Sequence, residues 1–199
     1  MRKIRYYKQH SPESCGVCCM LMALDAFGVE YPTIARERQL YAMLHSKAAP
    51  GTEGASLALG LARRGLDVTL VHSCPDLIDN RSGYYPPDLH RALLAECQDC
   101  IRRGEGLFTL EAGVPVTCQR LRQELAQNRL VILQVLIPGD ADGMHDHVLH
   151  GMLLYRCDER LLYACDPWRG RLALTDEEIE REMETPVGRM CITIGPKKA

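Results

Sequence analysis

The strongest constraint on the fold is an apolar helix near the start of the chain, predicted to run from Cys15 to Phe27. Its large apolar side chains recur with the helical period of about 3.6 residues and so share one face: Val17, Met20, Leu21, Leu24 and Phe27. Ser14 or Glu13 is placed to cap the start of the helix, and Gly28 is placed to close it. Such a helix is stable only when its apolar face is packed on other elements.

Later segments of the chain supply that surface, because they show the alternation typical of strands. The predicted strands cover residues 66–71, 130–137, 147–157, 161–166 and 189–194. Further helices are predicted at residues 33–44, 53–64, 87–103, 117–128 and 175–184, the last opened by a capping box of Thr175 and Glu178. Helices lead and strands gather late, which indicates an α+β fold and not a regular βαβ alternation. We therefore expect the N-terminal helix to pack on a late antiparallel sheet.

The length of 199 residues fits one domain, or one domain with a large insertion. Apolar residues make up 46% of the chain and charged residues 25%, as in an ordinary globular protein that buries a core. No internal repeat and no low-complexity linker divides the sequence. We predict a single domain over residues 1–199, with a loop–helix insertion at about residues 73–113.

Charge and hydropathy exclude several classes of function. The formal net charge is -2 and both signs are interspersed, so no stripe indicates nucleic-acid binding and no patch indicates a membrane surface. The basic N-terminus lacks the apolar stretch of a secretory signal, and the longest apolar runs are too short to cross a bilayer. We expect a cytoplasmic protein with no nucleic-acid partner and no membrane insertion.

Cys15 is the first candidate for chemistry among ten cysteines, most of which we expect to be reduced in a cytosolic chain of this length. It lies in the first turn of the predicted helix, where unpaired N–H groups and the helix dipole favour a negative charge. The thiolate is the nucleophilic form of cysteine, and Gly16 leaves room for a substrate backbone. An isolated cysteine at a helix start is more often a small buried residue, so its partners decide the question.

The sequence around Cys15 resembles the catalytic helix of the bacteriocin-processing, double-glycine leader peptidases, which are papain-like cysteine peptidases. Members have a Gln six residues before the Cys, then Cys-Gly, a run of small and apolar residues, and a closing Gly. Gln9, Cys15, Gly16 and Gly28 occupy those positions here. The resemblance implies a papain-like fold. It also implies that Gln9 donates its side-chain amide beside the Cys15 N–H to form an oxyanion hole.

The resemblance continues in the predicted hairpin near the C-terminus. Family members carry a His that opens one strand, and an Asp-Pro sixteen residues later at the end of the next. His150 and Asp166 have this spacing, Pro167 follows, and the turn at residues 158–160 falls midway between them. The resemblance therefore implies a triad of Cys15, His150 and Asp166, in which Asp166 orients His150 and His150 shares the Cys15 proton.

His147 is the alternative base, and His145 lies in the same segment. His147 begins the apolar run more naturally, but it is nineteen residues from Asp166, which would misplace the hairpin turn. Residues 147 and 150 also face opposite sides of a strand, so both cannot point at Cys15. We favour His150 on this spacing and strand periodicity.

The function that the resemblance implies is hydrolysis of a peptide bond, in leader-peptide or protein processing, through a thioester on Cys15. Two alternatives stay open: an acyl or amide transferase that uses the same thioester, and a non-catalytic module that binds leader peptides. The chain has no transmembrane run and no phosphate-binding loop, so it resembles free-standing relatives without transporter domains. The expected partner is a peptide or protein substrate, and the implied context is an export or peptide-maturation system.

Two Cys-x-x-Cys pairs allow a metal hypothesis, because Cys15, Cys18, Cys97 and Cys100 could be drawn as a four-thiolate zinc site. Both pairs, however, fall inside predicted helices, whereas zinc-binding pairs usually straddle a tight turn. We interpret Cys18, Cys97 and Cys100 as packing residues, and we expect no metal and no cofactor. A zinc-stabilised structural protein is the remaining alternative.

Overall fold

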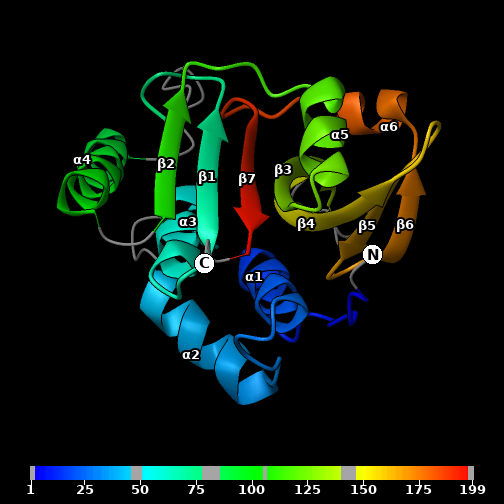
Figure 1. The fold of residues 1–199 in the computed structure, drawn as a ribbon, viewed down its shortest axis with the longest axis horizontal. Coiled ribbons are helices and arrows are strands. Elements are labelled where there is room, and N and C mark those ends of the chain that lie inside the picture. The colour runs from blue at the N-terminus through cyan, green and yellow to red at the C-terminus, as the bar shows by residue number, and fades with distance from the viewer. Residues whose placement is uncertain (1–2, 46–50, 78–85, 105–106, 140–146, 197–199) are drawn as a thin grey trace.

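A mixed sheet organises the fold, and helices cover both of its faces (Figure 1). The computed structural model describes residues 3–45, 51–77, 86–104, 107–139 and 147–196. In this part of the chain the strands are β1 (Asp67–His72), β2 (Leu107–Ala112), β3 (Leu130–Pro138), β4 (His147–Cys157), β5 (Leu162–Asp166), β6 (Gly170–Leu174) and β7 (Met190–Gly195). The helices are α1 (Cys15–Ala26), α2 (Ile34–Leu44), α3 (Gly54–Ala62), α4 (Pro87–Arg103), α5 (Cys118–Ala126) and α6 (Asp176–Glu182). Among these described helices, none is both long enough and apolar enough to span a bilayer.

The strand order fixes which residues face the start of α1. Over the described residues the sheet has seven strands in the order β2-β1-β7-β3-β4-β5-β6. Adjacent strands are antiparallel except β1 and β2, which are parallel. Between β3 and β4, Gln134 lies opposite Gly151 and Val135 lies opposite His150. This register holds His150 and Gly151 inside the sheet and not at an edge.

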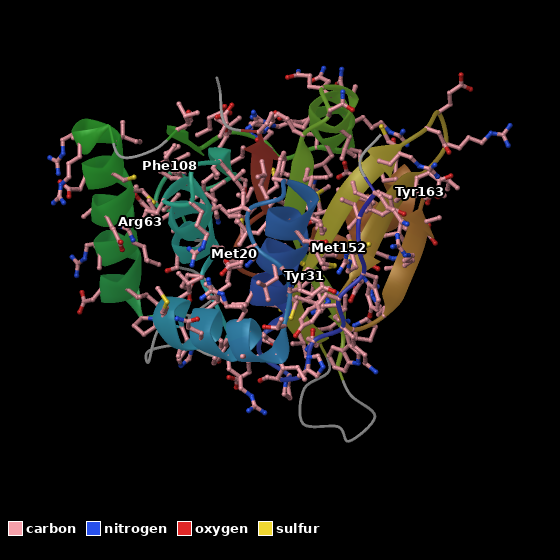
Figure 2. The ribbon with its side chains drawn as sticks, turned by 60° about the horizontal axis from the view of Figure 1, so that its bottom comes forward. Met20, Tyr31, Arg63, Phe108, Met152 and Tyr163 are labelled. Carbon is pink, nitrogen blue, oxygen red and sulfur yellow. The ribbon has the colours of Figure 1, made fainter. Side chains whose placement is uncertain are left out.

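The side chains of β3 alternate between two buried layers. Leu130 joins the core that contains α1 and α3, whereas Val131 joins the core beneath α5 and α6. Figure 2 labels one methionine of each layer, Met20 of α1 and Met152 of β4. Helix α1 packs on β3, β4 and β5, so the predicted packing of the N-terminal helix on the sheet is confirmed.

The predicted ends of α1 are partly confirmed. Gly28 follows the last turn with a φ of 70°, the left-handed conformation that closes a helix. Ser14 occupies the N-cap position, but the prediction that its side chain caps the helix is wrong. Its hydroxyl donates instead to Glu37 at 2.5 Å, and Glu13 accepts a hydrogen bond from the Tyr41 hydroxyl. The start of α1 is therefore tied to α2 through side chains.

Two strands, β2 and β6, lie outside the predicted set. Strand β2 falls in the segment predicted as a loop–helix insertion, and it pairs with β1 in parallel, so one end of the sheet is neither late nor antiparallel. Both strands are short edge strands, and most of their side chains are half-buried or exposed. An edge strand has only one neighbour to pair with and little to bury, so its hydrophobic pattern is weak.

Candidate active site

Cys15 is the first residue of α1, and close packing around Gly16 brings it against the sheet. A Cβ on Gly151 would lie 3.5 Å from the Gly16 Cα, and a Cβ on Gly16 would lie 2.7 Å from Cδ1 of Leu57 in α3. Glycine at these two positions lets the start of α1 fit between β4 and α3. Because Gly151 follows His150 on β4, the same contact brings Cys15 close enough to the His150 ring to raise the pKa of that ring.

His150 and Asp166 form a buried pair next to Cys15. His150 Nε2–H donates to Asp166 Oδ1 at 2.8 Å, and the two residues are 4% and 0% exposed. The β4–β5 hairpin brings them together across the sixteen residues that separate them in sequence. Since Nε2 is used by Asp166, Nδ1 is the ring nitrogen that remains for an interaction with the Cys15 thiol.

The charge on the His150 ring depends on these two neighbours. Burial lowers the pKa of His150, but the hydrogen bonds with Asp166 and with Cys15 outweigh burial and raise the pKa to about 9. The ring is therefore protonated at neutral pH. The Trp168 ring lies 6.1 Å from the His150 ring at an angle of 64° and covers it edge-on. A protonated imidazole beside a thiol is the arrangement that stabilises a thiolate.

Asp166 is held as a carboxylate by donors that the sequence analysis did not include. Its Oδ1 accepts from the backbone N–H groups of Trp168 and Arg169 at 2.8 and 2.9 Å, and its Oδ2 accepts from Arg169 Nε at 2.6 Å. Burial raises the pKa of Asp166, but the hydrogen bonds, that from His150 first, bring it down to about 2. Arg169 is fixed in turn by Glu182 of α6, at 2.7 and 2.9 Å. The signal that could have revealed these contacts is the arginine three residues after the predicted triad aspartate.

Gln9 lies near the triad, since its backbone N–H donates to the Pro167 carbonyl at 3.1 Å, one residue beyond Asp166. Its side-chain Nε2 donates to the carbonyls of Ser11 and Pro12 at 3.0 and 3.1 Å. Its Oε1 is buried with no partner among the described residues. The side-chain N–H groups of Gln9 therefore donate to the turn that leads into α1. To bind an oxyanion, Gln9 has to break one of these two hydrogen bonds. The oxyanion-hole role of Gln9 stays a prediction.

Glu37 of α2 is a buried residue that the sequence analysis missed, and it holds the segment before Cys15. Its side chain accepts from the His10 N–H and the His10 ring at 2.8 Å each, from the Tyr7 hydroxyl at 2.9 Å and from the Ser14 hydroxyl at 2.5 Å. Burial raises the pKa of Glu37, but these hydrogen bonds, that from Ser14 first, leave it below its usual value. No sequence signal separates Glu37 from the other charged residues of α2.

The remaining candidates are not gathered at Cys15. His147 is exposed at the start of β4, and strand alternation turns it to the face opposite His150. His145 lies outside the described residues. Cys18, Cys97 and Cys100 are buried cysteines outside any disulfide, the first on α1 and the other two on α4. Within the described ranges, no three or more His, Cys, Asp and Glu side chains come together as metal ligands would.

Comparison with known proteins finds structures with a similar fold but no matching sequence family. No protein-family profile matches the chain, and no curated protein matches it. A double-glycine motif protease from an AMS/PCAT transporter, solved in complex with the leader peptide, is similar with a TM-score of 0.52 and 14% identity, over 98% of this chain and 93% of that one. A C39-like peptidase from Bacillus anthracis has a TM-score of 0.57 and 10% identity, over 98% and 96%. The peptidase domain of Streptococcus ComA, a bi-functional ABC transporter, has a TM-score of 0.53 and 12% identity, over 98% and 99%.

These similarities extend over nearly the whole chain and are not confined to the helix of Cys15. The chain therefore has the fold of the C39, double-glycine peptidase domains, and the papain-like α+β fold predicted from the sequence is confirmed. Identities of 10% to 14% establish a shared fold and leave activity to be argued from the site.

Proposed function

We propose that this protein is a cysteine peptidase in which Cys15 is the nucleophile, His150 is the general acid–base and Asp166 orients His150. One observation carries the proposal. The buried His150 ring lies between the Asp166 carboxylate, at 2.8 Å, and the Cys15 thiol at the start of a helix. This is the arrangement that a thiolate–imidazolium pair needs. The peptidase fold of the solved neighbours supports the same interpretation.

In the proposed reaction the Cys15 sulfur attacks the carbonyl carbon of the scissile peptide bond and forms a C–S bond. His150, which holds the proton from Cys15, gives that proton to the leaving amine as the C–N bond breaks. A water molecule then transfers a proton to His150 and attacks the thioester, which releases the acid product and Cys15. Asp166, whose pKa of about 2 keeps it ionised, holds the ring in place throughout.

The negative oxygen of the tetrahedral intermediate needs hydrogen-bond donors near Cys15. The backbone N–H of Cys15 lies at the first position of α1, where no intrahelical partner exists for it. Gln9 is the second donor in this proposal, with one N–H turned away from the Pro12 carbonyl. We expect Gln9→Ala to lower kcat by about 100-fold, with little change in KM, as for other single oxyanion donors.

The proposed substrate is a peptide or a protein. More specifically, we propose a precursor that carries a leader peptide and belongs to an export or maturation system. A neighbouring structure was solved in complex with its leader peptide. Hydrolysis, and not transfer to an amine, is the proposed fate of the thioester because Cys15 is only half-buried and water can reach it.

Peptide cleavage tests this proposal most simply. A mixture of peptides of random sequence is incubated with the protein in water enriched in oxygen-18, and new termini are identified by mass spectrometry. Wild type is expected to produce new carboxyl termini that carry the heavy oxygen. Cys15→Ala and His150→Ala are expected to produce none, whereas Cys157→Ala, which removes another half-buried thiol, leaves cleavage unchanged.

Each contrary result points elsewhere. Products joined to an amine without the heavy oxygen would show a transferase. Binding of peptides with no cleavage by wild type would show a recognition module and would overturn the proposal. Cleavage that persists in Cys15→Ala would overturn the assignment of the nucleophile.

A further inference from the structure

A second polar feature lies near the start of α3, and Thr52, shortly before that helix, is close to Gly16. It is a recess with a cavity volume of about 30 Å³, and its empty volume reaches about 400 Å³ only when the space that is open to solvent is counted. Its walls come from α3, from strands β1, β3 and β7, and from the segment before β7. The apolar walls include Leu70, Val187 and Met190, and the polar groups are Glu53, His72 and Gln134. None of these residues takes part in the proposed triad.

The recess shares its walls with the Cys15 site. A Cβ on Gly16 would lie 3.7 Å from the Thr52 hydroxyl, so the residues directly before α3 run beside the start of α1. On the sheet, Gln134 pairs with Gly151, whose Cβ would lie 3.9 Å from the carbonyl carbon of Cys15. Glu53 therefore follows a residue that lies beside Gly16, and Gln134 pairs with a residue that packs against Cys15.

Glu53 is the unusual member of this group. It is 6% exposed, and among the described residues no group donates a hydrogen bond to its carboxylate and no cation pairs with it. It occupies the N-cap position of α3, but its side chain does not cap that helix. Burial alone raises the pKa of Glu53 to about 7. A buried carboxylate without a partner is costly, so such groups are normally paired or turned toward a ligand.

Two further polar groups of the recess, Gln134 and His72, each contribute an acceptor atom. Gln134 Oε1 is buried and has no hydrogen-bond partner among the described residues. His72 Nδ1 accepts from the Cys74 N–H at 3.0 Å, so in the neutral ring the proton is on Nε2. No lysine or arginine is among the described residues that line the recess. The site therefore offers a carboxylate and an amide oxygen between apolar walls.

We propose that this recess is a substrate subsite that binds the cationic end of a lysine or arginine side chain close to the scissile bond. The assignment rests on the proposed peptidase function, since it uses Cys15 to fix where the bond lies. Glu53 supplies the charge, Gln134 accepts a further hydrogen bond, and the walls formed by Leu70, Val187 and Met190 hold the aliphatic stem. A Gly-Gly pair has no side chain to fill the recess, so the subsite adds a requirement on another residue of the substrate.

Matched peptides test the specificity. A peptide that wild type cleaves and that carries lysine next to the scissile bond is compared with the same peptide carrying norleucine. We expect kcat/KM to fall about 10- to 100-fold for norleucine in wild type, because the charge-assisted hydrogen bonds are lost. In Glu53→Gln the lysine peptide is expected to lose this advantage. Glu177→Gln makes the same chemical change at an exposed position of α6 and should keep it.

A binding measurement separates failure of the subsite from failure of the peptidase assignment. The full-length protein is titrated with n-butylammonium and with n-butanol at pH 8, and backbone amide NMR signals are followed. The proposal expects saturable shifts at Gly54, Leu70 and Met190 with the ammonium only, and at least tenfold weaker binding in Glu53→Gln.

The outcomes are distinct. Equal binding of both probes, no shift at these residues, or unchanged binding in Glu53→Gln overturns the subsite, even if peptides are cleaved. Cleavage without any preference for lysine or arginine also overturns it. Butylammonium binding that depends on Glu53, in a protein that cleaves no peptide, supports a cation-binding recess and overturns the peptidase function.

Discussion

Two buried glutamates lie near the start of α1, and their hydrogen-bonding surroundings differ. Glu37 is 2% exposed and accepts four hydrogen bonds, from Tyr7, from Ser14 and twice from His10. Glu53 is 6% exposed and accepts none from the described residues. The pKa of Glu37 is accordingly lowered, whereas burial raises the pKa of Glu53 to about 7.

The difference separates a structural carboxylate from one that is available to a ligand. Glu37 is satisfied by the chain itself, and its hydrogen bonds fix the segment that carries Gln9 and leads to Cys15. Glu53 has a comparable degree of burial, and none of the described residues donates to it, so its charge destabilises the fold unless a ligand binds to it. The same residue type therefore has two roles: Glu37 stabilises the segment before Cys15, and Glu53 is available to bind a cation.

The largest expected effect is on stability when Glu37 is changed. Glu37→Gln keeps the shape of the side chain but replaces one acceptor oxygen by an NH₂ group. That group cannot accept the hydrogen bonds that Tyr7 and His10 donate. We expect the free energy of unfolding to fall by about 3 kcal/mol at pH 7. Urea denaturation measures it, with Glu177→Gln as the exposed control. A loss below about 0.5 kcal/mol would be no larger than a surface substitution gives and would contradict the structural role.

The opposite sign is expected for Glu53. Its pKa is raised from 4.5 to about 7 in the folded state, so folding at pH 8 carries the cost of burying an uncompensated charge. Glu53→Gln removes that charge and leaves only a neutral amide to bury. We expect the free energy of unfolding to rise by about 2 kcal/mol at pH 8. Destabilisation by this variant would mean that Glu53 has a stabilising partner.

The pH dependence sharpens the same contrast. Because the folded state holds the Glu53 proton more tightly, wild type loses stability as the pH rises from about 4.5 through 7, and Glu53→Gln lacks this loss. For Glu37 the folded pKa is lowered, so its contribution is present above pH 4.5 and is lost as the pH falls below that value. Denaturation of both variants and wild type from pH 4 to 8 checks this. Parallel curves for wild type and Glu53→Gln would refute it.

A smaller effect is expected from Ser14, one of the donors to Glu37. Ser14→Ala removes the hydroxyl that donates at 2.5 Å but leaves the hydrogen bonds from Tyr7 and His10 in place. We expect a loss of about 1 kcal/mol in the free energy of unfolding. If the serine acted as an ordinary helix cap, Ser14→Asp would restore the stability. Facing Glu37, an aspartate should instead lower it further.

The sequence predicts the elements whose apolar periodicity is strong, and it predicts the site where spacing constrains geometry. Helix α1 and the β4–β5 hairpin carry both signals, which is why His150 and Asp166 come together as expected. Edge strands β2 and β6 bury little and carry no clear pattern. Glu37 and Glu53 acquire their roles from neighbours distant in sequence or from burial, and no local pattern distinguishes them from solvated charges. Arg169 lies three residues after Asp166, and that spacing is a local signal for its contact.

The rate of Cys15 alkylation is the measurement that tests the proposed nucleophile most directly. Iodoacetamide is added at pH 6 and the modified cysteines are quantified by mass spectrometry over time. The pKa of His150 is about 9, so its ring is protonated at this pH, and the proposed mechanism pairs that ring with the attacking sulfur of Cys15. We predict that Cys15 reacts at least about tenfold faster than Cys157, and that His150→Ala abolishes this advantage. Equal rates for Cys15 in wild type and His150→Ala, or uniform slow labelling of all cysteines, would contradict the account.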